Sequence, residues 1–364
     1  MEEWKTYKLG DLIKIKYGKD HKSLADGNYP AYGSGGVMRM VERPIYDKPS
    51  ILIPRKGSLN NIIYTEKPFW TVDTMFWTII DTKLVLPHYL YYTIKDVDFA
   101  SLNVGSAVPS LTCPIIEAIE VSIPCIETQK MILNCIEPLD SKIELNNRIN
   151  HNLEEQAQAL FDNYFIHNTI DLGDTKTVFL TDIATYLNGL AMQKFPAKDK
   201  GLPVLKIKEL GQGYCDNSSD RCSSDILEKY IINDGDCIFS WSGTLLVDLW
   251  CGGQCGLNQH LFKVSSDNYP KWFYYLWTKH HLDTFIHIAK DKAVTMGHIK
   301  RSELEKAIVI MPSKEKLDNL SKLFEPIINQ IIQLRIMNRT LAQQRDELLP
   351  KLMSGELKIN EIDC

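Results

Sequence analysis

The sequence predicts an α+β protein in which two globular domains, related by a pseudo-two-fold axis, are joined by two long antiparallel helices that form a coiled-coil spacer. Three observations predict this fold. Short motifs recur in the same order in both halves, and each half closes with a long heptad pattern. Before that pattern, each half mixes short β-rich segments and turn signals with few helices.

The internal repeat covers most of the chain. Its matching pairs are 9–12 (LGDL) with 180–183 (LTDI), Gly18 with Gly189, 52–58 (LIPRKGS) with 238–244 (IFSWSGT), 72–77 with 257–262, 87–92 with 270–275, and 121–124 with 309–312. The offset is 171 residues at the first pair and 188 at the last, and then stays constant. This pattern indicates variable loops followed by a segment of constrained length.

The constrained segments are predicted to be helices at 127–168 and 314–356, because their apolar positions alternate in steps of three and four. The residues expected at the interface of the two helices are Ile136, Ile143, Asn150, Leu153, Leu160, Phe324, Ile331, Asn338, Leu341 and Leu348. Asn150 and Asn338 hold equivalent positions, and a buried amide fixes register when it meets a partner across the interface. The alternative is that each amphipathic helix lies on its own domain.

Two prolines bear on the length of these helices. Pro138 and Pro326 lack an amide donor, so each helix is expected either to start or to kink there. The 28 residues from Pro138 to Phe165 would form a rod about 40 Å long, since an α-helix rises about 1.5 Å per residue. One turn of B-DNA measures about 34 Å, so antiparallel helices could hold two readers about one turn apart.

The predicted domain order is therefore 1–126, a first globular domain; 127–168, a helix; 169–313, a second domain; 314–356, a second helix; and 357–364, a tail. The net charge of -5 is unusual for a nucleic-acid binder. However, residues 1–125 carry 14 basic and 14 acidic side chains, whereas 126–170 carry 3 and 7. The acidic excess therefore lies largely in the first helix.

Candidate DNA contacts in the first half lie in two turns. Tyr32 and Ser34 belong to a glycine-rich loop, with Arg39 close behind. Arg55, Lys56 and Ser58 follow an apolar strand, where an arginine can reach a guanine edge and a serine can hold phosphate. The alternative for Arg55 and Lys56 is an ordinary solvent-exposed turn.

The second half carries different side chains at the corresponding turn. Trp241, Ser242 and Thr244 stand where the first half has Arg55, Lys56 and Ser58. Lys206 and Lys208 form a basic cluster, and Lys292 lies in a later glycine-containing loop. We therefore expect the two domains to prefer different base sequences.

No catalytic or metal site is predicted. The chain has no phosphate-binding loop, methyltransferase motif, nucleophile elbow or HExxH motif. Cys251, Cys255 and His260 could offer ligands to zinc, but their spacing is loose and no second pair completes a tetrahedral site. With no secretory leader and no run of eighteen apolar residues, the expected location is the cytoplasm and no membrane contact is expected.

The ordered, duplicated phrases resemble the specificity subunits of Type I restriction-modification systems of bacterial defence. The resemblance rests on the opening at residues 4–15, on ILIPRKGS and CIFSWSGT, on the strand ends at Pro124 and Pro312, and on LLPKLMSGEL at 348–357. It implies a non-catalytic, DNA-binding subunit with two target-recognition domains, each reading half of a split site in double-stranded DNA, and a helical spacer between them.

The resemblance also implies partners. Two methyltransferase subunits would bring S-adenosylmethionine and methylate adenine at N6, and restriction subunits would use ATP and Mg²⁺. This chain would bind no cofactor itself. The rival hypothesis is a coiled-coil protein scaffold that does not read DNA, which the acidic net charge favours and the basic loops oppose.

Overall fold

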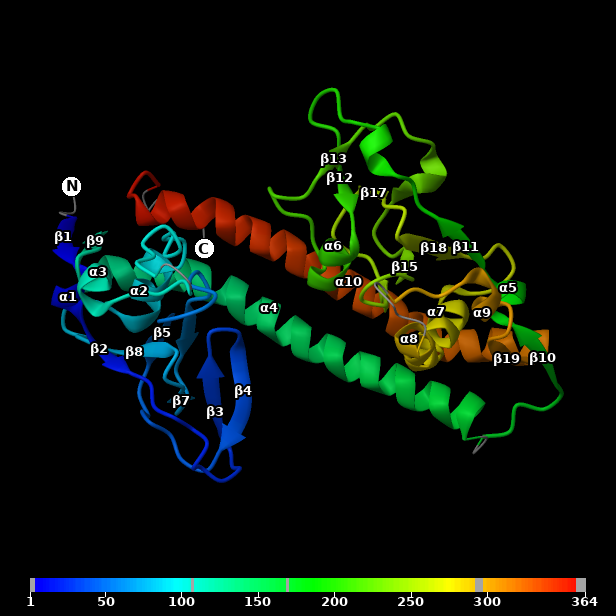
Figure 1. Cartoon of the computed structure of the whole chain (residues 1–364), viewed down its shortest axis with the longest axis horizontal. Helices are drawn as coiled ribbons and strands as arrows, with labels where there is room; N and C mark the ends of the chain where they lie inside the picture. The colour runs from blue at the N-terminus through cyan, green and yellow to red at the C-terminus, as the bar shows by residue number, and fades with distance from the viewer. Residues whose placement is uncertain (1–3, 106–107, 168–169, 292–296, 358–364) are drawn as a thin grey trace. The chain divides into compact units, whose positions relative to one another are not determined.

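The computed structural model describes residues 4–105, 108–167, 170–291 and 297–357. The chain divides into two compact units, Met1–Asp140 with Gln343–Cys364 and Ser141–Ala342. Each unit holds one globular domain and part of each long helix, α4 (Ile126–Phe161) and α10 (Lys314–Met353) (Figure 1). The first unit therefore combines two separate stretches of sequence, whereas the second is one continuous stretch.

The first domain consists of short elements before α4. They are β1 (Lys5–Lys8), α1 (Leu9–Leu12), β2 (Ile13–Tyr17), β3 (Tyr29–Gly33), β4 (Gly36–Val41), β5 (Ser50–Pro54), β6 (Ile63–Thr65), β7 (Trp70–Thr71), β8 (Met75–Ile80), α2 (Pro87–Ile94), α3 (Cys113–Glu117) and β9 (Glu120–Ile123). In the described part of the chain, the sheets have the orders β1-β9, β2-β8-β5-β6 and β4-β3-β7. Strand β5 is buried at every residue, as its apolar run predicts.

The second domain follows a similar plan. Its elements are β10 (Thr175–Phe179), α5 (Leu180–Ile183), β11 (Thr185–Asn188), η2 (Met192–Lys194), β12 (Leu202–Leu205), α6 (Ile207–Gln212), β13 (Arg221–Cys222), η3 (Glu228–Tyr230), β14 (Ile231–Ile232), β15 (Cys237–Ser240), β16 (Leu246–Leu249), β17 (Cys255–Leu257), β18 (Leu261–Ser265), α7 (Lys271–His280), α8 (Leu282–Asp291), α9 (Arg301–Leu304) and β19 (Ile308–Pro312). Over the described residues the sheets are β10-β19, β11-β18-β15-β16 and β13-β12-β17-β14.

The internal repeat is confirmed in local geometry. The side chains of Asp11 and Asp182 accept a hydrogen bond from the backbone amide three residues earlier, at 3.0 and 2.8 Å, and so cap equivalent short helices. Gly18 and Gly189 lie so close to the backbone of Val72 and Asn258 that an added Cβ would stand 1.9 and 2.1 Å from the carbonyl oxygens of these two residues. Only glycine fits at either position, which explains why both copies carry it.

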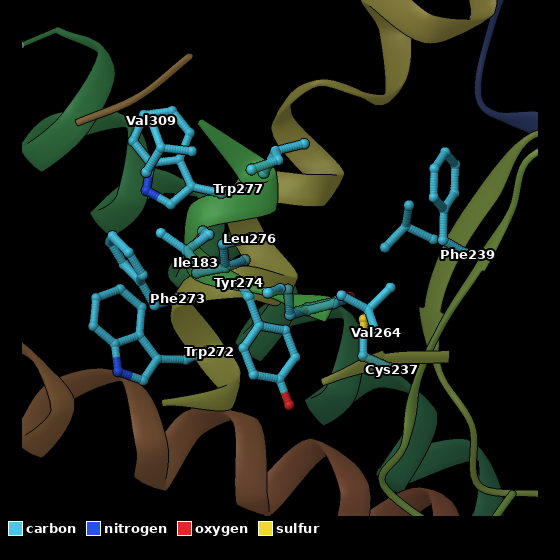
Figure 2. Packing of buried hydrophobic residues seen from close by; sticks show 14 of the residues in the cluster. Ile183, Cys237, Phe239, Val264, Trp272, Phe273, Tyr274, Leu276, Trp277 and Val309 are labelled. Carbon is cyan, nitrogen blue, oxygen red and sulfur yellow. The ribbon is translucent and has the colours of Figure 1, made fainter. Parts of the chain in front are cut away.

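The core of the second domain is aromatic and includes parts of both long helices. Trp272, Phe273 and Trp277 on α7 are buried together with β15 and β18 residues (Figure 2). Trp272 stacks on Phe324 of α10, with ring centroids 4.2 Å apart and an interplanar angle of 8°. Phe161, at the end of α4, joins the same cluster. Two helix segments far apart in sequence thus complete this core.

The first domain is completed in the same way. Ile132 and Ile136 near the start of α4 share a buried cluster with Leu349 and Leu352 near the end of α10. The amphipathic start of each helix therefore lies on its own domain, as the alternative interpretation proposed. The end of the other helix packs into the same core as well. Packing on its own domain therefore describes the start of each helix, and packing with the other helix describes the rest.

The helices pack antiparallel within the second unit. Asn146 on α4 donates to Asn338 on α10 at 2.8 Å, and Glu154, further along α4, binds Arg335, which is earlier on α10. Residue numbers thus rise along one helix as they fall along the other. In the first unit, Asp140 of α4 binds Arg345 of α10 at 2.7 Å.

The expected meeting of Asn150 with Asn338 is wrong. Asn338 instead bonds to Asn146 and Asn147, while the buried Oδ1 of Asn150 has no partner among the described residues. Because the helices are antiparallel, equivalent residues of the two copies face each other at only one level of the helix pair. Asn150 lies beyond that level and therefore does not face Asn338. The sequence repeat identified the polar layer but not its register.

The remaining interface residues divide between three environments. Ile136 and Leu348 belong to the core of the first domain, and Leu153, Leu160, Phe324 and Ile331 belong to that of the second. Ile143 and Leu341 are half-buried outside both cores. Of the two alternatives expected at Pro138 and Pro326, a helix start is wrong, because α4 begins at Ile126 and α10 at Lys314. The rods are accordingly longer than the 28 residues counted from the proline, at 36 and 40 residues.

Candidate nucleic-acid interface

The turn after β5 carries three of the predicted DNA contacts. The Arg55 amide donates to the Thr74 carbonyl at 2.8 Å, and its guanidinium lies over the ring of Tyr17, 5.6 Å from the centroid. Tyr17 is 56% exposed, and Lys56 and Ser58 are exposed as well. Arg55 forms no ion pair with a carboxylate of the described residues. The turn therefore presents a cation that an aromatic face orients.

The corresponding turn after β15 presents an indole. Trp241 donates from Nε1 to the side-chain oxygen of Asn188 at 3.0 Å, and its ring lies 5.7 Å from that of Phe262. Thr244 is exposed, but Ser242 is only 6% exposed. Sequence position alone paired Ser242 with the exposed Lys56, and the structure shows that these side chains differ in accessibility.

The two turns share one backbone construction. Gly57 and Gly243 take left-handed φ angles of 92° and 66°, which side chains disfavour. Their amides donate to the carbonyls of Pro109 and Gly297 at 3.2 and 3.0 Å. A later loop in each domain, which contains that carbonyl, therefore fixes its turn. The scaffold is conserved between the copies while the exposed chemistry changes from a cation to an indole.

The other candidates of the first domain are partly engaged within it. Arg39 donates to the Asp26 carboxylate at 2.7 Å and to the Leu24 carbonyl at 3.0 Å. Tyr32 is half-buried and packs against a small apolar cluster. The Ser34 carbonyl accepts a hydrogen bond from the side chain of Asn61 at 2.7 Å. The Ser34 hydroxyl lies close to Gly57, because a Cβ added to Gly57 would stand 2.8 Å from the hydroxyl oxygen. Ser34 and the Arg55 turn thus lie side by side.

The lysines of the second domain are neutralised locally. Lys206 pairs with Asp220, and Lys208 pairs with Asp216 at 3.3 Å. A phosphate contact by either lysine would exchange one anion for another, which lowers its net contribution. Lys292 lies outside the described residues. Three candidates thus share one turn in each domain, whereas Lys206 immediately precedes α6 and Lys208 lies within that helix.

Comparison with known proteins identifies the family. The model of the Type I restriction modification DNA specificity domain matches residues 1–155 and 173–339. The chain belongs to this family. The two matched stretches are the two copies of the repeat, so the family domain occurs twice.

Curated proteins that are similar to this chain are named as specificity subunits of Type I restriction enzymes. This specificity-family chain is 26% identical to the MjaIX specificity subunit of Methanocaldococcus jannaschii over 395 residues, covering 98% of this chain and 89% of the relative. It is 29% identical to the HindI specificity subunit of Haemophilus influenzae over 197 residues, which are 46% of this chain and 41% of the relative. The fold is similar to the S subunit from M. genitalium, with a TM-score of 0.59, 15% identity and 96% coverage of both chains.

Sequence reasoning missed Tyr17, the aromatic support of Arg55 in this specificity-family chain. Tyr17 ends β2, and Arg55 follows β5, with β8 between these strands in the sheet. No local pattern links two strands that pair only through a third. The only sequence signal was the aromatic residue at the end of the alternating KIKY run.

A pocket of about 530 Å³ in the first domain was also missed. Asp20, His21, Ser34, Met38 and Asp73 are among its lining residues, and both aspartates are exposed. Two carboxylates repel phosphate but accept hydrogen bonds from an exocyclic amino group, as cytosine offers in the major groove. The pocket shares Ser34 with the turn region and adds acceptors where the turn supplies donors.

Cys251, Cys255 and His260 do not form a cluster of metal ligands in the described structure. Cys251 and Cys255 are buried, and burial raises the pKa of the Cys251 thiol to about 11. Within the residues described, no three His, Cys, Asp or Glu side chains gather in a way that could hold a metal ion. In the same residues, no helix has the length and apolar character needed to span a membrane.

Proposed function

We propose that this chain reads a two-part DNA target, one part with each domain, and docks methyltransferase subunits that modify it. The observation that carries this proposal is the pair of equivalent turns. Their backbones are built alike, yet one carries half-buried Arg55 beside exposed Lys56, and the other carries half-buried Trp241 near exposed Thr244. A duplicated scaffold with different exposed chemistry suits the reading of two different base sequences by one fold.

In the first domain, Arg55 is the proposed reader of a guanine edge. A guanidinium can donate two parallel hydrogen bonds to guanine O6 and N7, and stacking on Tyr17 limits the orientations that it can adopt. Lys56 and Ser58, exposed on the same turn, would hold the neighbouring phosphates. The acidic pocket beside Ser34 would accept hydrogen bonds from a cytosine amino group.

In the second domain, the proposed contacts rely less on charge. Trp241 offers an apolar face suited to a thymine methyl group, and exposed Thr244 offers a hydroxyl. The lysine pairs with Asp216 and Asp220 keep the local charge near neutral until phosphate displaces a carboxylate. We expect the second half-site to depend less on salt than the first.

The chemistry of modification is assigned to the partners. S-adenosylmethionine would be bound by two methyltransferase subunits, and ATP with Mg²⁺ by restriction subunits. This chain would contribute no catalytic residue and bind no cofactor. Its exposed helix positions, such as Leu145 and Leu323 at 42% and 47% exposure, are available to apolar partner surfaces.

The test is a salt titration of duplex binding by the chain in complex with its methyltransferase partners. Specific binding should weaken steeply with salt, because each neutralised phosphate contributes about -0.9 to the slope of log K against log salt. A duplex with both half-sites scrambled is the control. Equal binding to both duplexes, or the absence of any salt-dependent binding to DNA, would instead favour the protein scaffold.

A further inference from the structure

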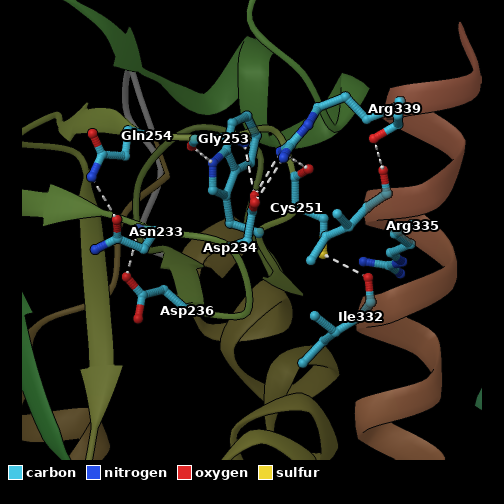
Figure 3. A network of polar contacts seen from close by, with 12 residues as sticks. Asn233, Asp234, Asp236, Cys251, Gly253, Gln254, Ile332, Arg335 and Arg339 are labelled. Atoms are coloured by element: carbon cyan, nitrogen blue, oxygen red, sulfur yellow. Dashed lines mark hydrogen bonds and ion pairs between the residues drawn. The ribbon is translucent and has the colours of Figure 1, made fainter. Parts of the chain in front are cut away.

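A network of ion pairs joins the second domain to one face of α10 (Figure 3). Arg339 donates from Nη1 and Nη2 to the two carboxylate oxygens of Asp234, at 2.7 and 2.8 Å. The same guanidinium donates to the carbonyl of Cys251, and Asp234 also accepts from the amide of Gly253 at 2.8 Å. One helix residue thus holds two loops of the domain, those before β15 and after β16.

Arg335, one turn earlier on α10, forms a second attachment. It donates to the Asp248 carboxylate on β16 at 2.8 Å and to the Leu249 carbonyl at 3.0 Å. Its other nitrogen donates to Glu154 of α4 at 2.7 Å. Arg335 therefore connects the domain to both long helices of its unit.

These pairs stay charged under ordinary conditions. The hydrogen bonds from Arg339 hold the pKa of the Asp234 carboxyl below its usual value, despite the opposing effect of burial. Burial acts to lower the pKa of Arg335, but the nearby carboxylates of Asp248 and Glu154 outweigh it and raise the pKa. Both contacts are therefore charge-assisted at neutral pH, and such contacts depend strongly on geometry.

Among the described residues, the first copy does not repeat this attachment at the equivalent helix positions. At the constant offset of 188, the counterparts of Arg335 and Arg339 are Asn147 and His151. Asn147 bonds to Asn338, and exposed His151 lies 3.3 Å from Glu155 of its own helix. Instead, α2 of the first domain contacts α4 through His88 with Glu137, at 2.8 Å, and through other polar pairs.

We propose that Arg335 and Arg339 are positioning residues that fix the orientation of the second domain on α10, and thereby set the spacing of the two half-sites on DNA. The inference rests on the proposed function. Apolar packing, such as that of Phe324 on Trp272, holds the domain against the first part of α10. The two arginine contacts, one turn apart, add directional restraints further along the helix, and α10 continues into the other unit.

The experiment measures binding of the complex with its methyltransferase subunits to duplexes whose half-sites are separated by the native spacing, one base pair less or one more. Arg339→Gln and Asp234→Asn remove the two sides of one pair. For each, the preference for native spacing should fall roughly tenfold, the ratio that one charge-assisted hydrogen bond supports. The double variant should match Arg339→Gln, because that substitution alone already removes the contact with Asp234.

Three further measurements separate positioning from folding. Base preference within each half-site should be unchanged, since no reading residue is altered. Arg339→Lys should give an intermediate loss, because lysine keeps the charge without the two-pronged geometry. Arg148→Gln, the same change at an exposed position of α4, should behave as the unaltered chain.

The outcomes are distinct. Variants that fold, as judged by an unchanged melting temperature of the complex, but keep the native spacing preference would overturn the inference. So would an equal loss of affinity at every spacing, which a merely structural role predicts. If Arg339→Gln fails to fold, the isosteric Asp248→Asn gives the same comparison through Arg335. Failure of the unaltered complex to distinguish its target from scrambled DNA would overturn the proposed function itself.

Discussion

At the scale of single residues, the two domains differ in chemistry at one backbone position. Arg55 and Trp241 each follow a buried strand and precede a left-handed glycine by two residues. Arg55 rests on exposed Tyr17, whereas Trp241 is anchored by Asn188 and Phe262. Each side chain is thus pre-oriented, so little conformational freedom remains to be lost on binding.

Replacing Arg55 tests its proposed role. Arg55→Gln should weaken binding to the target by about 1–3 kcal/mol and relax base preference at one position of the first half-site, because glutamine cannot make the two-pronged contact with guanine. Competition binding with single-base variants of the target measures both effects. Lys83→Gln, an exposed loss of charge in the same domain, is the control. A uniform loss across all bases would show that Arg55 contacts only phosphate.

At the scale of elements, each long helix has several neighbours along its length. The start of α10 packs into the second domain through Leu320 and Phe324, its middle bonds to α4 through Asn338, and its end enters the core of the first domain. The heptad pattern is continuous because every segment needs an apolar face. The pattern therefore does not reveal which partner each segment contacts.

The end of α10 should stabilise the first domain specifically. Leu349 is 2% exposed in its core, and Leu349→Ala should lower the unfolding free energy by about 2–5 kcal/mol, because removing buried methyl groups leaves a cavity. Amide hydrogen exchange should show lost protection in β5 but not in β15. Lys351→Ala, at an exposed position two residues away, should change little. Equal loss in both strands would mean that the two units unfold together.

At the scale of the whole molecule, the chain forms two units, of which the first draws on both ends of the sequence and the second is one continuous stretch. Residues from Gln343 onward complete the first unit, although the entire second unit lies between them and Asp140. The long helices begin at Ile126 and Lys314, whereas the compact units divide after Asp140 and Ala342, so the predicted boundaries at 126 and 313 do not delimit the compact units. Any exchange of domains must respect the helix ends that fill each core.

Exchanging the first domain tests modular reading. Residues 1–125 replaced by those of another family member, with core positions chosen to accept Leu349 and Leu352, should change only one half of the methylated motif. Mapping N6-methyladenine in cells that express the partner subunits measures this. The reciprocal exchange of residues 170–312 should change the other half. Changes in both halves from a single exchange would contradict independent reading.

Sequence patterns predicted the helices and strands well because these elements depend on residues that are close together along the chain. The duplicated order of motifs, the glycine at the same place in both copies and the two helices each leave a signal in a short window. The candidate site was predicted less completely. The exposed turn at Arg55 was found from its residues, but burial of Ser242 and the ion pairs of Arg39, Lys206 and Lys208 depend on residues remote in sequence.

By itself, the sequence determined that one α+β unit occurs twice, that each copy ends in a long helix, and that the two copies expose different chemistry. Only the tertiary structure decided that Asn338 meets Asn146 rather than Asn150, that each core receives the end of the other copy's helix, and that arginines attach the second domain alone in this way. The reason is physical. Periodicity and capping arise from neighbours along the chain, whereas register and ion pairing arise from packing between segments nearly two hundred residues apart.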